Sequence, residues 1–262
     1  MNFLQLENKR FLIFGVANKR SVAYSVVQML LEQQAECVLT VRDEPTKERV
    51  QSLFPKCDVL VCNVQHEAEI VQLRNELSDR KFDGLVHSIA FADYADGMKP
   101  FHETPKAAFL EALDISCFSL TTIAREFATL LTPDASVVTI SISTTRMASE
   151  NYGFMAPIKA ALDSSLAFLT KSFSAFSNVR FNAVGASLLK TSASAGIPGY
   201  ADSYLYAEKV IPRKKALQTD EAAAVAVFLL SPRSSGINAQ KIIVDAGMSI
   251  NYFDKDIIAK ST

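Results

Sequence analysis

The sequence has no marked excess of charge of either sign. It carries 27 lysine and arginine residues against 28 aspartate and glutamate residues, for a formal net charge of −1. Nucleic acids and anionic membrane surfaces attract proteins with a clustered basic excess. The balance therefore predicts no nucleic-acid partner and no membrane partner.

Cysteine and histidine are scarce, and neither shows the spacing of a metal site. No two cysteines form a Cys-x-x-Cys pair, which favours buried free thiols in a reducing cytosol. We expect no bound metal. His87 ends an apolar run and is expected to be packed or to line a site. The residues concerned are Cys37, Cys57, Cys62 and Cys117, with His66, His87 and His102.

Long apolar runs are also missing. No uninterrupted run approaches the roughly 18 residues that span a bilayer, and the first ten residues are too polar for a signal peptide. These features predict a soluble cytoplasmic protein. The 262 residues, 49% of them hydrophobic, can build a large core. Without a repeat or a linker, residues 1–262 are expected to form a single domain.

Short apolar runs alternate with amphipathic stretches along the chain. Continuous runs of Val, Ile and Leu are typical of strands buried on both faces, and repeated strand–helix units build a parallel sheet. We therefore predict an α/β fold with a doubly wound, Rossmann-like parallel sheet of about seven strands and helices on both faces. Strands are expected at 10–15, 36–41, 58–62, 84–89, 135–142, 179–184 and 241–244. Helices are expected at 21–34, 45–53, 67–77, 105–131, 152–176 and 219–230.

The stretch 187–216 breaks this rhythm. It contains Gly196, Pro198 and Gly199 among several small residues. An irregular segment of that length in a compact domain is usually a lid or a binding loop. We expect it to be a substrate-binding loop.

Ligands of a doubly wound sheet bind beyond the carboxyl ends of the strands. Gly15 follows the first strand and allows close backbone approach, and Ser21 opens a helix whose unpaired N–H groups suit a diphosphate. The usual Gly-x-Gly-x-x-Gly is absent, because the turn has one glycine. An ordinary strand-to-helix turn would give the same pattern.

Polar residues follow the next three strands as well. Arg42 and Asp43 end the second strand, where an arginine suits a ribose 2′-phosphate and an acid suits a free 2′-hydroxyl. The choice between NAD (NADH) and NADP (NADPH) therefore stays open. Asn63 can bond an adenine edge, although asparagine is also ordinary turn chemistry. Ser88 would lie beside the nicotinamide ribose.

Tyr152 and Lys159, with six residues between them, form the most informative pair. On a helix they would lie on one side, nearly two turns apart. The lysine leans toward the N-terminus, and an ammonium near a phenol lowers the phenol's pKa and favours proton donation. A sugar hydroxyl of a bound nucleotide could bridge the remaining gap. On the pair alone, an exposed lysine and a packed tyrosine are the favoured interpretation.

Five motifs carry a resemblance to a known family. They are Gly-Val-Ala-Asn-Lys-Arg-Ser-Val-Ala-Tyr at 15–24, Phe-Asp-Gly-Leu-Val-His-Ser-Ile-Ala-Phe-Ala at 82–92, Leu-Asp-Ile-Ser at 113–116, Asn-Tyr-Gly-Phe-Met-Ala-Pro-Ile-Lys-Ala at 151–160, and Val-Asp-Ala-Gly-Met-Ser-Ile at 244–250. From about Leu6 to Tyr252 the chain resembles the enoyl-acyl-carrier-protein reductases of type II fatty-acid synthesis, a divergent branch of the short-chain dehydrogenases/reductases. The tyrosine–lysine spacing belongs to this branch.

The resemblance implies reduction of an enoyl thioester by NADH or NADPH, with acyl-carrier protein as the partner and a homotetrameric assembly. Tyr152 would stabilise the enolate, and Lys159 would hold the nicotinamide ribose and tune Tyr152. The residues implied to contact the dinucleotide are Gly15, Ala17, Ser21, Val22, Arg42, Asn63, Val64, Ser88, Ala90, Ile115, Lys159 and Thr191. Those implied to line the acyl channel are Ala92, Met155, Ala193, Ile197 and Tyr200.

The chain departs from the family pattern at three places. Ile142 stands where the family usually has a second tyrosine, so one hydrogen-bond donor is missing; losing such a donor typically costs about 100-fold in rate. Ser187, Leu188 and Leu189 replace a glycine–proline pair, and Asn63 replaces an aspartate. Two alternatives therefore remain beside the enoyl reductase: a related reductase with a changed substrate, and a catalytically weak dinucleotide-binding paralogue.

Overall fold

The computed structural model describes residues 3–95, 97, 99–148, 153–255 and 257. Its seven strands form one sheet in the order β3-β2-β1-β4-β5-β6-β7, and every neighbouring pair is parallel. The predicted doubly wound α/β fold is confirmed. The strands are β1 (Arg10–Phe14), β2 (Glu36–Val41), β3 (Asp58–Val61), β4 (Phe82–His87), β5 (Leu131–Ile142), β6 (Arg180–Ala186) and β7 (Lys241–Val244).

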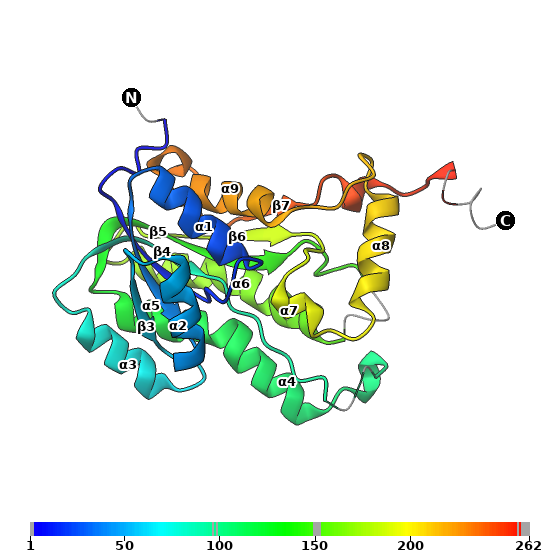
Figure 1. The fold of residues 1–262 in the computed structure, drawn as a ribbon, viewed down its shortest axis with the longest axis horizontal. Helices are drawn as coiled ribbons and strands as arrows, with labels where there is room; N and C mark the ends of the chain where they lie inside the picture. The colour runs from blue at the N-terminus through cyan, green and yellow to red at the C-terminus, as the bar shows by residue number, and fades with distance from the viewer. Residues whose placement is uncertain (1–2, 96, 98, 149–152, 256, 258–262) are drawn as a thin grey trace.

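Helices cover both faces of the sheet (Figure 1). The helices are α1 (Val22–Glu32), α2 (Glu44–Leu53), α3 (Glu67–Glu76), α4 (Lys106–Leu113), α5 (Ser119–Phe127), α6 (Met155–Phe173), α7 (Ser192–Ala195), α8 (Tyr200–Val210) and α9 (Thr219–Leu230). Short 3-10 turns lie at η1 (Phe101–Glu103), η3 (Pro232–Ser234) and η4 (Met248–Ile250), and a π-helical turn, η2 (Asp114–Phe118), joins α4 to α5.

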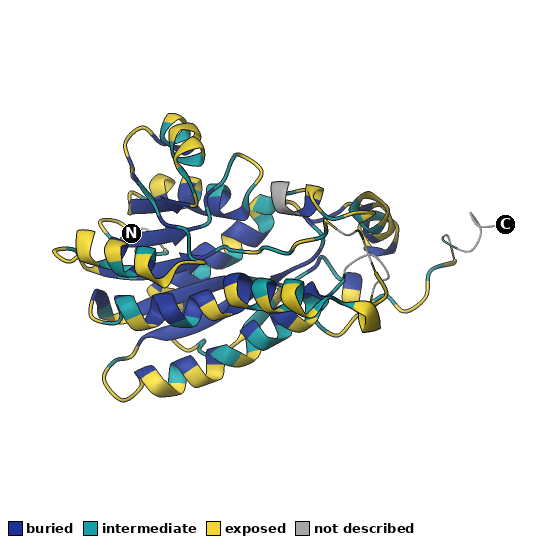
Figure 2. Cartoon of the chain, turned by 90° about the horizontal axis from the view of Figure 1, so that it is seen from below, coloured by how far each residue is buried: buried dark blue, intermediate teal, exposed yellow. Residues whose placement is uncertain are grey.

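Alternate residues of each strand enter two separate cores. In β1, Phe11 and Ile13 pack into a core with α1 and α9, whereas Leu12 and Phe14 pack into a core with α3, α5 and α6. Successive strand side chains point to opposite faces, so a strand without polar residues is needed between two helical layers. Figure 2 shows the result as buried strands between helices that are exposed on their outer sides.

Two of the predicted helices differ from the structure by at least three residues at an end. The helix expected from Tyr152 begins at Met155, because Gly153 and Phe154 form a turn in which Gly153 has φ of 53°. Tyr152 itself lies outside the described residues. The helix expected over 105–131 ends at Phe127, and Leu131 already belongs to β5.

The segment 187–216 is not irregular, contrary to the expectation. It contains α7 and the eleven-residue helix α8, whose buried side chains are Tyr204, Ala207 and Val210. Gly199 precedes α8 in the left-handed conformation with φ of 71°, which a glycine adopts without steric cost. The glycines and the proline therefore separate short helices instead of marking a long loop.

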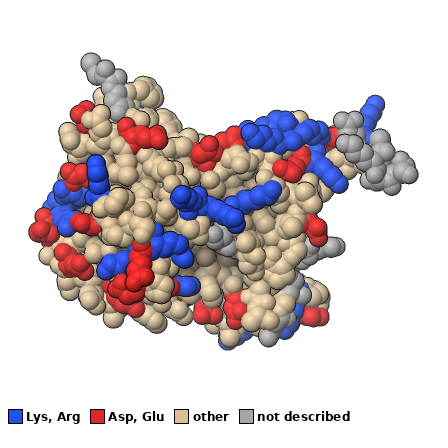
Figure 3. All heavy atoms as spheres, in the orientation of Figure 1, with Lys and Arg blue, Asp and Glu red and all other residues tan. Residues whose placement is uncertain are grey.

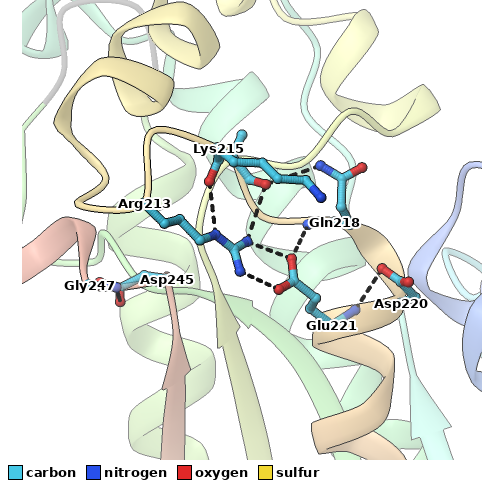
Figure 4. Close-up of polar contacts among 8 residues, drawn as sticks. Arg213, Lys215, Gln218, Asp220, Glu221, Asp245 and Gly247 are labelled. Atoms are coloured by element: carbon cyan, nitrogen blue, oxygen red, sulfur yellow. Dashed lines mark hydrogen bonds and ion pairs between the residues drawn. The ribbon is translucent and has the colours of Figure 1, made fainter.

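The turn after α8 is fastened to the first turn of α9. The guanidinium of Arg213 donates two hydrogen bonds to the carboxylate of Glu221, one of them at 2.7 Å, and others to the carbonyls of Lys215 and Ala216 (Figure 4). Glu221 also accepts the N–H of Gln218 at 2.9 Å in a capping box. The Arg213 hydrogen bonds are the main reason that the pKa of Glu221 falls to about 2. This contact ties the turn after α8 to the start of α9.

The structure bears on two expectations from composition, the free cysteines and the lack of a membrane-spanning run. All four cysteines are buried and free. The continuous helix from Lys106 to Phe127 is long and apolar enough to cross a membrane by length and composition alone, but half of its most apolar window is buried inside the molecule. Core helices of soluble proteins pass the same test.

Candidate dinucleotide and substrate site

A cavity of about 960 Å³ opens at the carboxyl ends of the strands. Its walls come from the segments that follow β1, β2, β3, β4, β5 and β6, together with α6, α7 and α8. Because β1 and β4 are neighbours in the sheet although they are not consecutive in the chain, the cavity lies over the point where strand order reverses. Open α/β sheets bind their ligands at such a point.

The described residues predicted to bind the cofactor all line this cavity. They are Gly15, Ala17, Ser21, Val22, Arg42, Asn63, Val64, Ser88, Ala90, Ile115, Lys159 and Thr191. Of those predicted to line the acyl channel, Ala92, Met155, Ile197 and Tyr200 do so. Tyr152 and the side chain of Ala193 lie outside what the structure describes. The sequence therefore identified residues far apart in the chain that the fold brings to one cavity.

Gly15 makes a close approach that no other residue type allows. It has φ of 90°, and a Cβ at this position would lie 2.1 Å from the carbonyl oxygen of Ser88. Ser88 is held there because its N–H donates to the carbonyl of Phe14 at 3.0 Å. The segments after β1 and β4 thus meet backbone to backbone. The two segments form a flat floor of the cavity without a side chain at Gly15, which suits an elongated ligand such as a dinucleotide.

The N-terminus of α1 faces the same cavity. Ser21 caps this helix: its hydroxyl accepts the N–H of Tyr24 at 3.2 Å and donates to the carbonyl of Asn18 at 2.8 Å. The first turn of α1 contains no acidic residue. Its remaining N–H groups and the positive end of the helix dipole are therefore available to a diphosphate.

Arg42 and Asp43 take different roles at the end of β2. Asp43 caps α2 by accepting the N–H of Thr46 at 2.9 Å, and hydrogen bonds from Thr46 and then Arg42 lower its pKa. Arg42 lines the cavity and pairs with Asp43 at 3.1 Å. Arg49 of α2 donates to the carbonyl of Ala17 at 3.0 Å, next to the same region. A cation, not an acid, therefore lies at the cavity wall here.

Asn63 at the end of β3 serves the turn as well as the cavity. Its side-chain oxygen accepts the N–H of Gln65 at 3.2 Å, and its backbone N–H donates to Glu69 at 2.7 Å. These contacts fit the ordinary turn chemistry of asparagine. They still leave the side-chain NH₂ as a donor toward an adenine edge.

Lys159 is buried in the cavity wall with 2% of its surface exposed. Its ammonium donates to the carbonyls of Ile89 at 3.0 Å and Ile140 at 2.9 Å. Burial lowers the pKa of Lys159 to about 8, an effect that the charge of Asp163 and then Cys117 partly opposes. An ammonium has three N–H donors. Two of them hold the ends of β4 and β5, and the third has no partner among the described residues and can serve a ligand.

Buried polar side chains brace the floor around Lys159. His87 lies between Thr139 and Ser119, with both ring nitrogens 2.9 Å from a hydroxyl oxygen. Burial and then the charge of Lys159 lower the pKa of His87 to about 3, so the ring is neutral. His87 is thus packed, which is one of the two possibilities expected from the sequence.

In the π-helical turn, Ser116 bonds both backbone groups of Phe91, its hydroxyl accepting at 2.8 Å and donating at 2.9 Å. π-helical turns often occur at functional sites.

Tyr200 contacts the segment that replaces the expected glycine–proline pair. Its hydroxyl donates to the carbonyl of Leu189 and accepts the N–H of the same residue, both at 2.9 Å. Burial raises the pKa of Tyr200 to about 12. The Tyr200 ring borders the cavity, but its hydroxyl is committed to holding residues 187–191 against α8.

Sequence reasoning missed several polar residues of the site. Ser141 is buried and lines the cavity, yet its hydroxyl has no hydrogen-bond partner in the described part of the chain. Thr144 and Tyr94 also line the cavity, as does Ile142. Position after a strand end was the signal that found Ser88 and Asn63, and it could have found Thr144. Ser141 lies inside β5, where that signal does not reach.

The fold and this cavity together define a dinucleotide-binding reductase of the Rossmann type. A model of the family described as enoyl-(acyl carrier protein) reductase matches residues 15–249. The chain belongs to that family.

Relatives and solved structures agree with the family. The enoyl-acyl-carrier-protein reductase (NADPH) FabI of Staphylococcus aureus NCTC 8325 is 33% identical over 253 residues, covering 93% of this chain and 98% of the relative. The NADH enzyme FabI of Escherichia coli K12 is 32% identical, covering 94% and 95%. The crystal structure of the NADH enzyme from Aquifex aeolicus VF5 superimposes with a TM-score of 0.90 at 30% identity, covering 95% of this chain and 99% of that one.

Proposed function

We propose that the protein reduces the 2,3 double bond of an enoyl thioester carried by acyl-carrier protein, with NADH or NADPH, in fatty-acid elongation. The observation that carries the proposal is the buried ammonium of Lys159, which lies in the cavity wall and uses two of its three donors on partners within the described part of the chain. The family and the relatives, which include NADH and NADPH enzymes, support the same reaction.

The residues of the chain fit the proposed cofactor. The Gly15–Ser88 floor would fill if Gly15 carried a Cβ, and the N-terminus of α1 offers donors to the diphosphate. Lys159 would hold the nicotinamide ribose by its third donor. When bound, the reduced nicotinamide supplies the hydride that reaches the β-carbon of the enoyl group.

The protein's part in the reaction is electrostatic. As the β-carbon gains a hydride, the electrons of the double bond move to the thioester oxygen, and the enolate then takes a proton at its α-carbon. Tyr152 would donate a hydrogen bond to that oxygen, and the charge of Lys159 would favour the donation. The apolar walls formed by Ala92, Met155 and Ile197 would hold the acyl chain and exclude water, which strengthens both interactions.

The proposal is tested by turnover. Wild-type protein mixed with a crotonyl thioester and NADH or NADPH is expected to consume the reduced cofactor, as followed by its absorbance. Tyr152→Phe removes the donor to the enolate oxygen and is expected to lower kcat by about 100-fold or more. Tyr252→Phe, at a fully exposed position, is the matched control and should retain full activity. Cofactor binding by calorimetry without turnover on any acyl length would favour the weak paralogue instead.

We further infer a preference for NADPH, because Arg42 lines the cavity while Asp43 is occupied by the N-terminus of α2. Arg42→Ala is expected to raise KM for NADPH about tenfold or more and to leave KM for NADH nearly unchanged, since a charge-assisted hydrogen bond to phosphate is lost. Arg80→Ala, which breaks a similar exposed pair with Asp58 at the other end of the sheet, is the control. Equal effects on both cofactors would contradict the inference.

The carrier protein would approach over α8. Figure 3 shows basic side chains gathered over the turn that follows α8, where Arg213, Lys214 and Lys215 are exposed. A positive surface at the end of α8, a helix whose first residues line the cavity, would steer an acidic partner. Lys215→Glu should therefore raise KM for a carrier-bound substrate more than for a small thioester; the same KM change for both would argue against this approach.

A homotetramer would cover the outer faces of α4, α5 and α6. Leu110 of α4, Phe118 of the π-helical turn η2 and Phe168 of α6 are exposed there, the last with 74% of its surface. Apolar side chains that gather on one face of a monomer mark an interface. Sedimentation of the protein as a single chain would rule the tetramer out. Cell fractionation would test the cytoplasmic location that the composition predicts.

A further inference from the structure

The side chain of Lys241 extends across the sheet and makes contacts that have no role in the proposed reaction so far. It belongs to β7, the edge strand, and its partner in the neighbouring strand β6 is Ala183. Its ammonium nevertheless donates to the carboxylate of Asp163 on α6 at 2.7 Å and to the hydroxyl of Thr145 at 2.8 Å. The side chain therefore joins three elements that are distant in the sequence.

Gly185 lets the lysine cross β6. A Cβ at Gly185 would lie 3.0 Å from Cδ and 3.1 Å from Cγ of Lys241. In the ladder Gly185 faces Ser141 of β5 on one side and Ile243 of β7 on the other. The aliphatic part of Lys241 thus passes over the one residue of β6 that has no side chain at this level, and its ammonium arrives at the end of β5.

Two of the groups that Lys241 contacts belong to the segment at the end of β5. It approaches the carbonyl of Ile142 at 3.4 Å, and Thr145 lies three residues further along the segment that leads from β5 toward Tyr152. Ile142 and Thr144 line the cavity. Asp163 lies one helical turn after Lys159 on α6, so the two share a helix face.

The charges around Lys159 depend on this contact. The groups that face it are Asp163 on its own helix, Cys117 from the π-helical turn and His87 from β4. Asp163 in turn is only 14% exposed at its side chain, and Lys241 is its ion-pair partner. Its other oxygen has no hydrogen-bond partner within the described residues, so Lys241 is the main restraint on this carboxylate.

We propose that Lys241 is a positioning residue that fixes the segment 142–148, which leads to Tyr152, against α6, which carries Lys159. It touches neither substrate nor cofactor. By fixing both the backbone after β5 and the carboxylate of Asp163, it sets the distance between the two catalytic groups and the charge that Lys159 experiences. The inference deepens the proposed reduction, and its kinetic part rests on that function.

The first test does not need activity. Lys241→Met keeps the length and removes the charge, and hydrogen exchange followed by mass spectrometry is expected to show faster exchange within residues 142–148. Lys9→Met is the matched control, because Lys9 also forms an ion pair, with Asp83 at 2.9 Å, but at the start of β1. Unchanged exchange in 142–148 would overturn the proposal, whatever reaction the protein catalyses.

The second test is kinetic. Lys241→Met is expected to lower kcat about tenfold or more with KM for the cofactor unchanged, since a misplaced catalytic group costs rate rather than binding. Lys241→Arg should restore part of the loss. Gly185→Ala displaces the same side chain without changing its charge and should give a weaker form of the same defect. If the wild type turns over and Lys241→Met has the same kcat, the positioning role is contradicted but the proposed function is not. If the wild type does not turn over, the proposed function is contradicted.

The pH profile separates positioning from a merely structural role. Asp163→Asn removes a charge that raises the pKa of Lys159, so the alkaline limb of kcat/KM should move to lower pH. Lys241→Met leaves Asp163 without its counter-charge, so that limb should move to higher pH. If both variants lost thermal stability while the alkaline limb of kcat/KM stayed where it is in the wild type, the contact would be structural only.

Discussion

Lys159→Met is expected to lower kcat/KM by about 1,000-fold, the range for removing a positioned proton-transfer or charge-stabilising group. The variant keeps the length of the side chain but loses the only ammonium that the described residues place in this wall of the cavity. The carbonyls of Ile89 and Ile140 lose their donor, while the cost of burying a charge disappears, so the fold should be retained. Steady-state kinetics with circular dichroism measures both effects.

The matched control is Lys171→Met, an exposed lysine in the last turn of the same helix, which should keep wild-type activity. A Lys159→Met enzyme with wild-type kcat/KM would show that the ammonium has no part in catalysis.

The wild type itself should lose kcat/KM above about pH 8, because burial has lowered the pKa of Lys159 to about 8. Stability should change the other way: the folded state releases this proton before the unfolded state does, so unfolding becomes harder from about pH 8 to 10.5.

Gly15→Ala is expected to lower the free energy of unfolding by about 3 kcal/mol and to abolish cofactor binding. Two costs add: the alanine must adopt φ of 90°, and its Cβ would overlap the carbonyl oxygen of Ser88. The segments after β1 and β4 must then separate, which removes the floor of the cavity. Denaturant unfolding and calorimetric titration with NADPH measure the two consequences.

Two other glycines separate the two costs. Gly97→Ala meets a positive φ of 78° but open space, and should cost about 1 kcal/mol. Gly236→Ala meets neither and should be neutral. If Gly15→Ala destabilised no more than Gly97→Ala, the close approach to Ser88 would not be needed for the fold.

The sequence predicted most of the sheet because the central strands are buried on both faces and are therefore largely apolar. The residues of β2, β7 and α9 agree with the prediction at both ends. The start of α6 did not, since Gly153 and Phe154 turn the chain before the helix begins. Tyr152 lies outside the described residues, so its predicted place on one helix face with Lys159 stays a prediction.

The helix α8 was missed for a different reason. Its buried positions are few, and the glycines and proline before it dominate the local pattern. The contact of Lys241 with Asp163 could not be predicted at all. It depends on β7 lying beside β6 and on the gap above Gly185, and neither follows from the spacing of residues along the chain. Strand ends could be located from sequence, whereas side chains that cross between strands could not.

The four buried cysteines have a practical consequence for watching the enzyme at work. Burial raises the pKa of each thiol, that of Cys62 to about 12, so the native protein should barely react with maleimides. Met147 is exposed at the rim of the cavity. Met147→Cys could therefore carry a fluorophore without background labelling, and the emission of that fluorophore would report substrate entry.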